Sequence, residues 1–107
     1  MAIKPKDMAK IVDHTILDPK ATVHDVKEKC KEAKEYELTA ICVQPCYVPL
    51  ATKLLKNSSV KVATVVAFPL GAETVETKAY ETKDAVRNGA QEIEVVANIS
   101  AIKEKKW

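Results

Sequence analysis

The chain has 107 residues, of which 47% are hydrophobic, 30% charged and 5% aromatic. This length suits one domain, residues 1–107, and the composition excludes a disordered chain. Seventeen basic and 15 acidic residues give a net charge of +2, and only residues 103–106 are locally basic. That stretch is typical of a solvated helix face, so we expect no nucleic-acid partner.

The sequence contains no run of about 18 apolar residues, so we expect no membrane-spanning helix and no membrane partner. Residues 1–7 lack an apolar signal core, which predicts a cytoplasmic protein. The three cysteines, Cys30, Cys42 and Cys46, are then expected to be free thiols. Zinc binding at Cys42 and Cys46 would need two more ligands, and both histidines lie far back in the chain. We therefore predict no metal site.

Short apolar runs alternate with longer amphipathic runs along the chain, as expected for β-α units around a parallel sheet. The expected strands are 13–17, 38–43, 60–67 and 92–97. The expected helices are 7–12, 22–36, 47–56 and 73–88, and a further helix begins in the last ten residues. Thr22 is predicted to cap the second of these helices, and Gly89 to end the fourth in a left-handed conformation.

This element order predicts an α/β fold with three successive right-handed crossovers between parallel strands. Such a run builds either an open doubly wound sheet or part of a (β/α)₈ barrel. The sequence has only two glycines and no glycine-rich phosphate loop after the first strand, which argues against a dinucleotide-binding fold. A whole barrel needs about 250 residues, so four strands correspond to half of one.

Polar residues within the apolar strands are candidates for an internal site, because an unpaired buried charge is costly. Side chains alternate between the two faces of a strand. The following sets are therefore expected to line the barrel interior: Asp13 and Thr15; Ala40, Cys42 and Gln44; Thr64 and Val66; and Glu92, Glu94, Val96 and Asn98.

Each candidate also has a structural explanation that the sequence leaves open. Asp13 is also suited to cap a turn, Cys42 to pack as a small core residue, and Glu94 to reach solvent at a sheet edge. His14 is expected to pack on the outer face, Lys61 to lie at a solvated strand end and Lys78 on a helix surface.

Four segments resemble the deoxyribose-phosphate aldolase family, in order and with the family's spacing. They are DHTILDP at 13–19, AICVQPCYVP at 40–49, VKVATVVAFPLG at 60–71 and NGAQEIEVV at 88–96. The resemblance implies a TIM barrel and a place in deoxyribonucleotide catabolism. It implies a class I aldolase, a lyase that reversibly cleaves 2-deoxy-D-ribose 5-phosphate to D-glyceraldehyde 3-phosphate and acetaldehyde. The chemistry uses a lysine Schiff base and needs no metal and no organic cofactor.

Carried over by position, the resemblance implies that Asp13, Thr15 and Cys42 line the substrate pocket. Glu94 stands where the family has a proton-relay aspartate. Glutamate keeps the charge but moves the carboxylate by one methylene, and a misplacement of about 1 Å can cost about 100-fold in rate. Glu37 stands where the family commonly has glycine, which is a further departure.

The family's Schiff-base lysine lies on strand six and a second lysine on strand seven, whereas this sequence reaches strand four. No lysine here is assigned to the Schiff base, and we expect the chain alone to be inactive. The expected partners are a phosphorylated deoxysugar or aldehyde substrate in the complete barrel, and either a complementary half-barrel or a second copy that closes the barrel by self-association. The alternatives are a self-associating structural half-barrel and a small-molecule binding module without aldolase activity.

Overall fold

The computed structural model describes residues 2–106 and confirms the predicted sheet of four parallel strands in the order β1-β2-β3-β4. The strands are β1 (Asp13–Ile16), β2 (Ala40–Val43), β3 (Lys61–Val66) and β4 (Glu92–Val95). The helices are α1 (Pro5–Ala9), α2 (Val23–Glu35), the 3₁₀ turn η1 (Pro45–Tyr47), α3 (Val48–Leu54), α4 (Val75–Arg87) and α5 (Ile99–Lys103).

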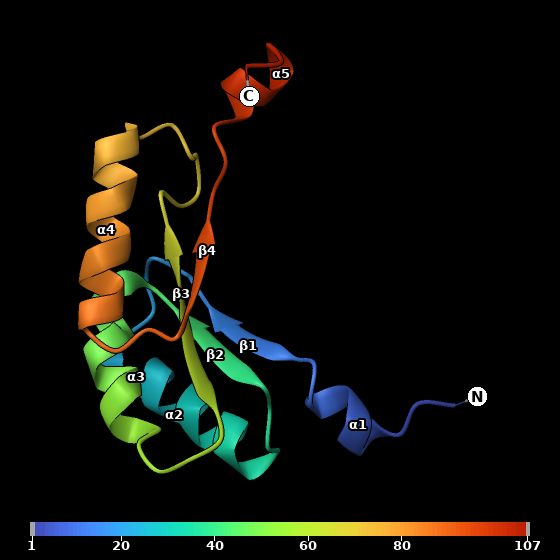
Figure 1. Cartoon of the computed structure of the whole chain (residues 1–107). Helices are drawn as coiled ribbons and strands as arrows, with labels where there is room; N and C mark the ends of the chain where they lie inside the picture. Colours follow the sequence, from blue (N-terminus) through green and yellow to red (C-terminus); the bar gives the residue numbers. More distant parts are fainter. Residues whose placement is uncertain (1, 107) are drawn as a thin grey trace.

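The sheet is covered by helices on one side only. Figure 1 shows α2, α3 and α4 on the same side of the strands, while α1 and α5 project from the body at opposite ends. We call the helix-covered side the outer face and the opposite side the inner face. Within the described residues β1 pairs only with β2 and β4 only with β3, so the sheet is open at both edges.

The main core lies between the outer face and the helices. Ile41, Val43 and Val62 point to this side and are buried against α2 and α3, where Val26 and Val48 are fully buried. Burying a valine or isoleucine side chain contributes about 1.5–3 kcal/mol, so this layer is the principal source of stability. Among residues 2–106 no helix has the length and apolar character that a bilayer crossing requires.

Several predicted boundaries moved by a few residues. The first helix spans 5–9 rather than 7–12, because Pro5 occupies its first turn, where proline needs no backbone donor. The predicted helix 47–56 is a 3₁₀ turn followed by α3. The fourth strand ends at Val95 rather than at 97, and Asn98 caps α5 through a bond that its side chain accepts from Ala101 N–H.

Helices α2 and α4 end in the same backbone arrangement. In α2, Leu38 N–H donates to Ala33 O at 2.9 Å, and the residue before Leu38, Glu37, has a positive φ of 51°. In α4, Ala90 N–H donates to Ala85 O at 3.0 Å, and Gly89 has a φ of 117°, as predicted. At the end of α2, Glu37 therefore occupies a backbone conformation that favours glycine.

Candidate active-site face

The strand register brings the predicted site residues to the inner face. Thr15 on β1 lies beside Cys42 on β2, and this row continues through Ala63 on β3 to Glu92 on β4. Residues paired in one row point to the same side of a parallel sheet, and residues two apart in a strand share a face. Asp13 and Glu94, two residues away from Thr15 and Glu92, therefore lie on this side as well.

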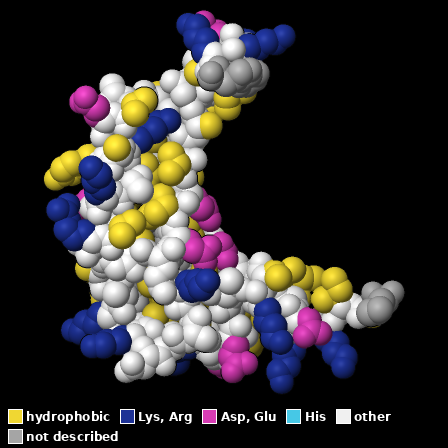
Figure 2. Space-filling model, viewed as in Figure 1, with side chains coloured by type: hydrophobic (Ala, Val, Ile, Leu, Met, Phe, Trp, Pro, Cys, Tyr) yellow, Lys and Arg dark blue, Asp and Glu magenta, His cyan; other side chains and the backbone are white. Residues whose placement is uncertain are grey.

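This side of the molecule is hollow between the projecting helices α1 and α5. Figure 2 shows acidic side chains on the wall of the hollow. Asp13, Thr15 and Glu94 are exposed on the inner face, whereas Cys42 is fully buried. Of the predicted set, three polar groups are thus exposed to solvent, and the thiol is buried beneath the same face.

The predicted contribution of β3 to this face was wrong. Val43 pairs with Thr64 and Thr64 pairs with Ile93, so Thr64 and Val66 belong to the outer face. Thr64 is fully buried there, and its hydroxyl donates to Val43 O at 2.6 Å. Ala63 and Val65 take the inner positions instead. Strand β3 is buried on both sides from residue 62 to 66, so its alternation does not indicate which side faces inward.

The pKa of the Cys42 thiol is affected by the acidic residues of the inner face. Its side chain packs with Ala63 and Val65 in a small second cluster on the inner face. Burial, and to a lesser extent the negative charges of Glu94, Asp13 and Glu92, together raise the pKa of the Cys42 thiol to about 11. The thiol is therefore neutral at pH 7 and unsuited to act as a nucleophile, because nucleophilic attack requires the thiolate.

A side-chain hydrogen bond joins the carboxyl-terminal ends of β1 and β2 beside the candidate residues. Gln44 Nε2 donates to Leu17 O at 2.8 Å across the gap between the two strands. Thr15 Oγ1 donates to Asp13 O at 3.0 Å.

Lys61 is exposed at the amino-terminal end of β3, as predicted.

His14 lies on the outer face, opposite the candidate site. Its Nε2 is 2.7 Å from Glu32 Oε2, and Lys29 Nζ lies 3.6 Å from the same oxygen. The hydrogen bond from His14 lowers the pKa of the Glu32 carboxyl. His14 therefore has a polar partner on α2 and takes no part in the inner-face set.

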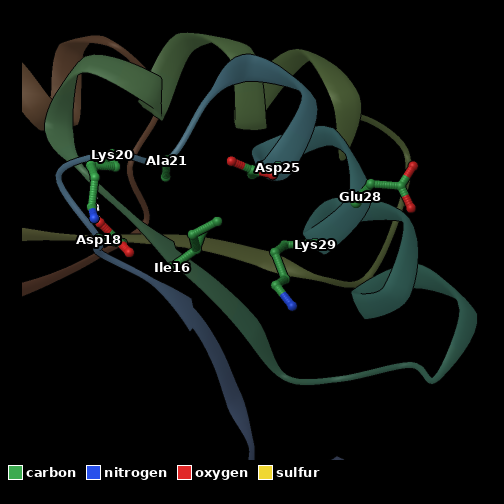
Figure 3. Close-up of a pocket in the computed structure, with 7 residues that line it drawn as sticks. All are labelled: Ile16, Asp18, Lys20, Ala21, Asp25, Glu28 and Lys29. Carbon is green, nitrogen blue, oxygen red and sulfur yellow. Dashed lines mark hydrogen bonds between the residues drawn. The ribbon is translucent and has the colours of Figure 1, made fainter.

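A separate pocket of about 370 Å³ lies beside the end of β1 and the start of α2. Figure 3 shows two of its lining residues, Ile16 of β1 and Lys29 of α2. Its remaining lining residues are Asp18, Lys20, Ala21, Asp25 and Glu28. None of the predicted site residues lines this pocket. Within residues 2–106 no group of three or more His, Cys, Asp or Glu side chains is placed to hold a metal ion.

Two charged residues of α4 reach the sheet and were missed by the sequence reasoning. Lys78 Nζ donates to Val96 O at 2.9 Å, and Glu81 Oε1 accepts from Ala67 N–H at 2.6 Å. Lys78 was predicted to lie on the helix surface, and the structure shows its side chain half-buried and bonded to the backbone after β4. Their i, i+3 spacing puts both on one helix face, but that spacing also fits a solvated ion-rich surface.

The chain resembles known aldolases in sequence along almost its whole length. Residues 7–107 match the DeoC/LacD family aldolases. The chain is 51% identical over 102 residues to the deoxyribose-phosphate aldolase of Clostridium perfringens, an alignment that covers 95% of this chain and 46% of that relative. The chain thus spans about half the length of the curated relatives it matches.

Solved structures show the same relationship. A Coccidioides immitis protein assigned as a deoxyribose-phosphate aldolase superposes with a TM-score of 0.95 at 37% identity, covering 99% of this chain and 42% of that one. The tetrameric deoxyribose-phosphate aldolase of Aeropyrum pernix superposes with a TM-score of 0.86 at 34% identity, covering 91% and 42%. The open sheet is accordingly half of a TIM barrel, as predicted. The chain belongs to the DeoC/LacD family of aldolases.

Proposed function

We propose that this chain supplies the amino-terminal half of the active site of a deoxyribose-phosphate aldolase. The observation that carries the proposal is the shared inner face of Asp13, Thr15, Cys42 and Glu94 on three strands of one open sheet. The reaction is the reversible cleavage of 2-deoxy-D-ribose 5-phosphate to D-glyceraldehyde 3-phosphate and acetaldehyde, in cytoplasmic deoxyribonucleotide catabolism. Asp13 and Thr15 contact the sugar, and Cys42 forms the pocket floor.

Glu94 acts in the proposed proton relay. Its exposed carboxylate lies on the same face as Asp13 and Glu92, and all three charges act on the Cys42 thiol. An acidic wall of this kind stabilises a positive charge that develops near it, such as the iminium of a Schiff base. The lysine that forms this Schiff base comes from the complementary half of the barrel, so this chain alone is proposed to be inactive.

The charge of the inner face also bears on the choice of partner. Closing the barrel with a second copy would bring two sets of Asp13, Glu92 and Glu94 into one lumen, where like charges repel. A complementary half that carries lysines would neutralise them instead. The self-associating structural half-barrel remains the second candidate, because the open edges of β1 and β4 are each able to pair with another strand. Mass measurement of the chain under native conditions separates the two, and a stable dimer would favour the structural module.

The enzyme proposal is tested in a chimera in which this chain replaces the matching half of the Clostridium perfringens relative. We expect the chimera to cleave 2-deoxy-D-ribose 5-phosphate and the chain alone to give no adduct on borohydride reduction with acetaldehyde. Glu94→Gln should lower kcat of the chimera by about 10²–10⁴-fold, the usual range for a lost acid or base. Glu94→Asp, which keeps the charge, should be at least as active as the parent chimera. A folded chimera without activity, or a borohydride adduct on the chain alone, would contradict the proposal.

A further inference from the structure

The carboxyl-terminal ends of β3 and β4 are both bonded to α4 through side chains that the proposed pocket does not use. Lys78 and Glu81 are one helical turn apart, within the first two turns of α4. Glu81 accepts a hydrogen bond from the backbone N–H of Ala67, the first residue after β3. Lys78 donates to the carbonyl of Val96, the first residue after β4. The two bonds thus end at equivalent points of neighbouring strands.

Ala67 needs such support because its conformation is unfavourable. It is almost fully buried, and its φ of 58° lies in the left-handed region that side chains with a Cβ adopt at a cost. Its N–H is bonded to Glu81, and its carbonyl accepts Gly71 N–H at 2.7 Å. A Cβ on Gly71 would collide with Ala97 O, so this loop lies directly against the chain that follows β4. Glu81 therefore secures the contact between the two strand ends.

Both backbone polar groups of Val96, its N–H and its carbonyl, are hydrogen-bonded. Its N–H donates to Val66 O at 3.0 Å, and its carbonyl accepts from Lys78 at 2.9 Å. Among residues 2–106, β4 has a neighbouring strand on the β3 side only, so the lysine provides a second attachment. Glu94 lies two residues before Val96. The two bonds at Val96 therefore also restrict the backbone of Glu94.

The side of α4 that faces the sheet carries charged residues in addition to the buried Ala85. A surface helix normally turns apolar residues toward its sheet and charged residues toward solvent. In α4 the half-buried residues include Lys78 and Glu81, whereas Val75 and Tyr80 are 84% and 69% exposed. Turning charged groups away from water costs free energy unless they are bonded. Their bonds to the strand ends meet that requirement.

We propose that Lys78 and Glu81 are positioning residues that hold the carboxyl-terminal ends of β3 and β4, and through β4 the carboxylate of Glu94, in the geometry of the active site. The inference rests on the proposed function only for its catalytic readout. The structural part concerns the chain itself and is tested without any substrate.

The first experiment is amide hydrogen exchange on the chain alone. Lys78→Met should speed exchange at Val96 by about 10-fold or more, since a charge-assisted bond is lost, while Lys78→Arg should keep most of the protection. Lys83→Met is the matched control, because Lys83 is an exposed lysine of the same helix. Glu81→Ala should likewise speed exchange at the Ala67 amide. Glu81→Gln, which retains an acceptor oxygen, should keep that amide protected. Wild-type exchange at Val96 in Lys78→Met would overturn the proposal.

The second experiment measures kinetics in the chimera described above. Lys78→Met should lower kcat by about 10–100-fold, the scale of a misplacement of about 1 Å, with less effect on KM, and Lys78→Arg should recover most of kcat. Unchanged kcat in a variant whose Val96 amide exchanges faster would reduce Lys78 to a structural role and overturn the proposal. A folded but inactive parent chimera would count against the proposed function, and the exchange experiment would then decide the inference by itself.

Discussion

Replacing Glu37 by glycine should stabilise the protein, which is unusual for a glycine substitution. Glu37 has a φ of 51° at the end of α2. A residue with a Cβ pays about 1–2 kcal/mol in this region. Glycine removes that cost but adds about 0.4–1 kcal/mol of unfolded-state entropy. The expected net gain is about 0.5–1 kcal/mol, which corresponds to a rise in Tm of a few degrees for a domain of this size.

The measurement is urea unfolding followed by circular dichroism, with Glu35→Gly as the matched control. Both positions are exposed glutamates at the same helix end, so both variants lose one negative charge and gain one glycine. Glu35 is helical, and glycine there should cost about 0.5–1 kcal/mol. In the reverse direction, Gly89→Ala should be strongly destabilising, because a Cβ there would collide with Thr52. Equal losses for Glu37→Gly and Glu35→Gly would show that Glu37 stores no backbone strain.

Three further outcomes follow from individual side chains. Burial, and then the charge of Glu94, raise the pKa of Cys42 to about 11, so the unfolded chain binds fewer protons between about pH 9 and 11. Stability should therefore fall as pH rises through that window, by at most about 1.4 kcal/mol per pH unit for this thiol, and Cys42→Ala should flatten this part of the urea-unfolding profile. An equally steep profile in Cys42→Ala would exclude the thiol as the cause. Thr22→Ala should cost about 1 kcal/mol through loss of the α2 cap. The hydrogen bonds from Thr22 lower the pKa of the Asp25 carboxyl, so the stability that this interaction contributes should be lost as pH falls below the ordinary carboxyl range. Thr22→Ala should remove this contribution, and an acid-unfolding profile of Thr22→Ala with the same slope as that of the wild type would contradict it.

The sequence alone determined the order and type of the elements, because hydrophobic periodicity and capping residues act over short distances. The Thr22 cap and the Gly89 helix end were found in this way, and both are present. The residues that share a face within one strand were also accessible, since that relation depends only on alternation. Asp13 with Thr15 is such a pair.

The direction that each strand faces was decided only by the tertiary structure. Alternation separates Thr64 from Val65 but does not say which of them points inward, and β3 is buried on both sides from residue 62 to 66. The register with β2 and β4 settled this, because hydrogen bonding between strands aligns their pleats and turns Thr64 outward. The contacts of Lys78 and Glu81 likewise depend on how α4 lies across the sheet. Such contacts join residues that are distant in the chain, and no local sequence pattern encodes them.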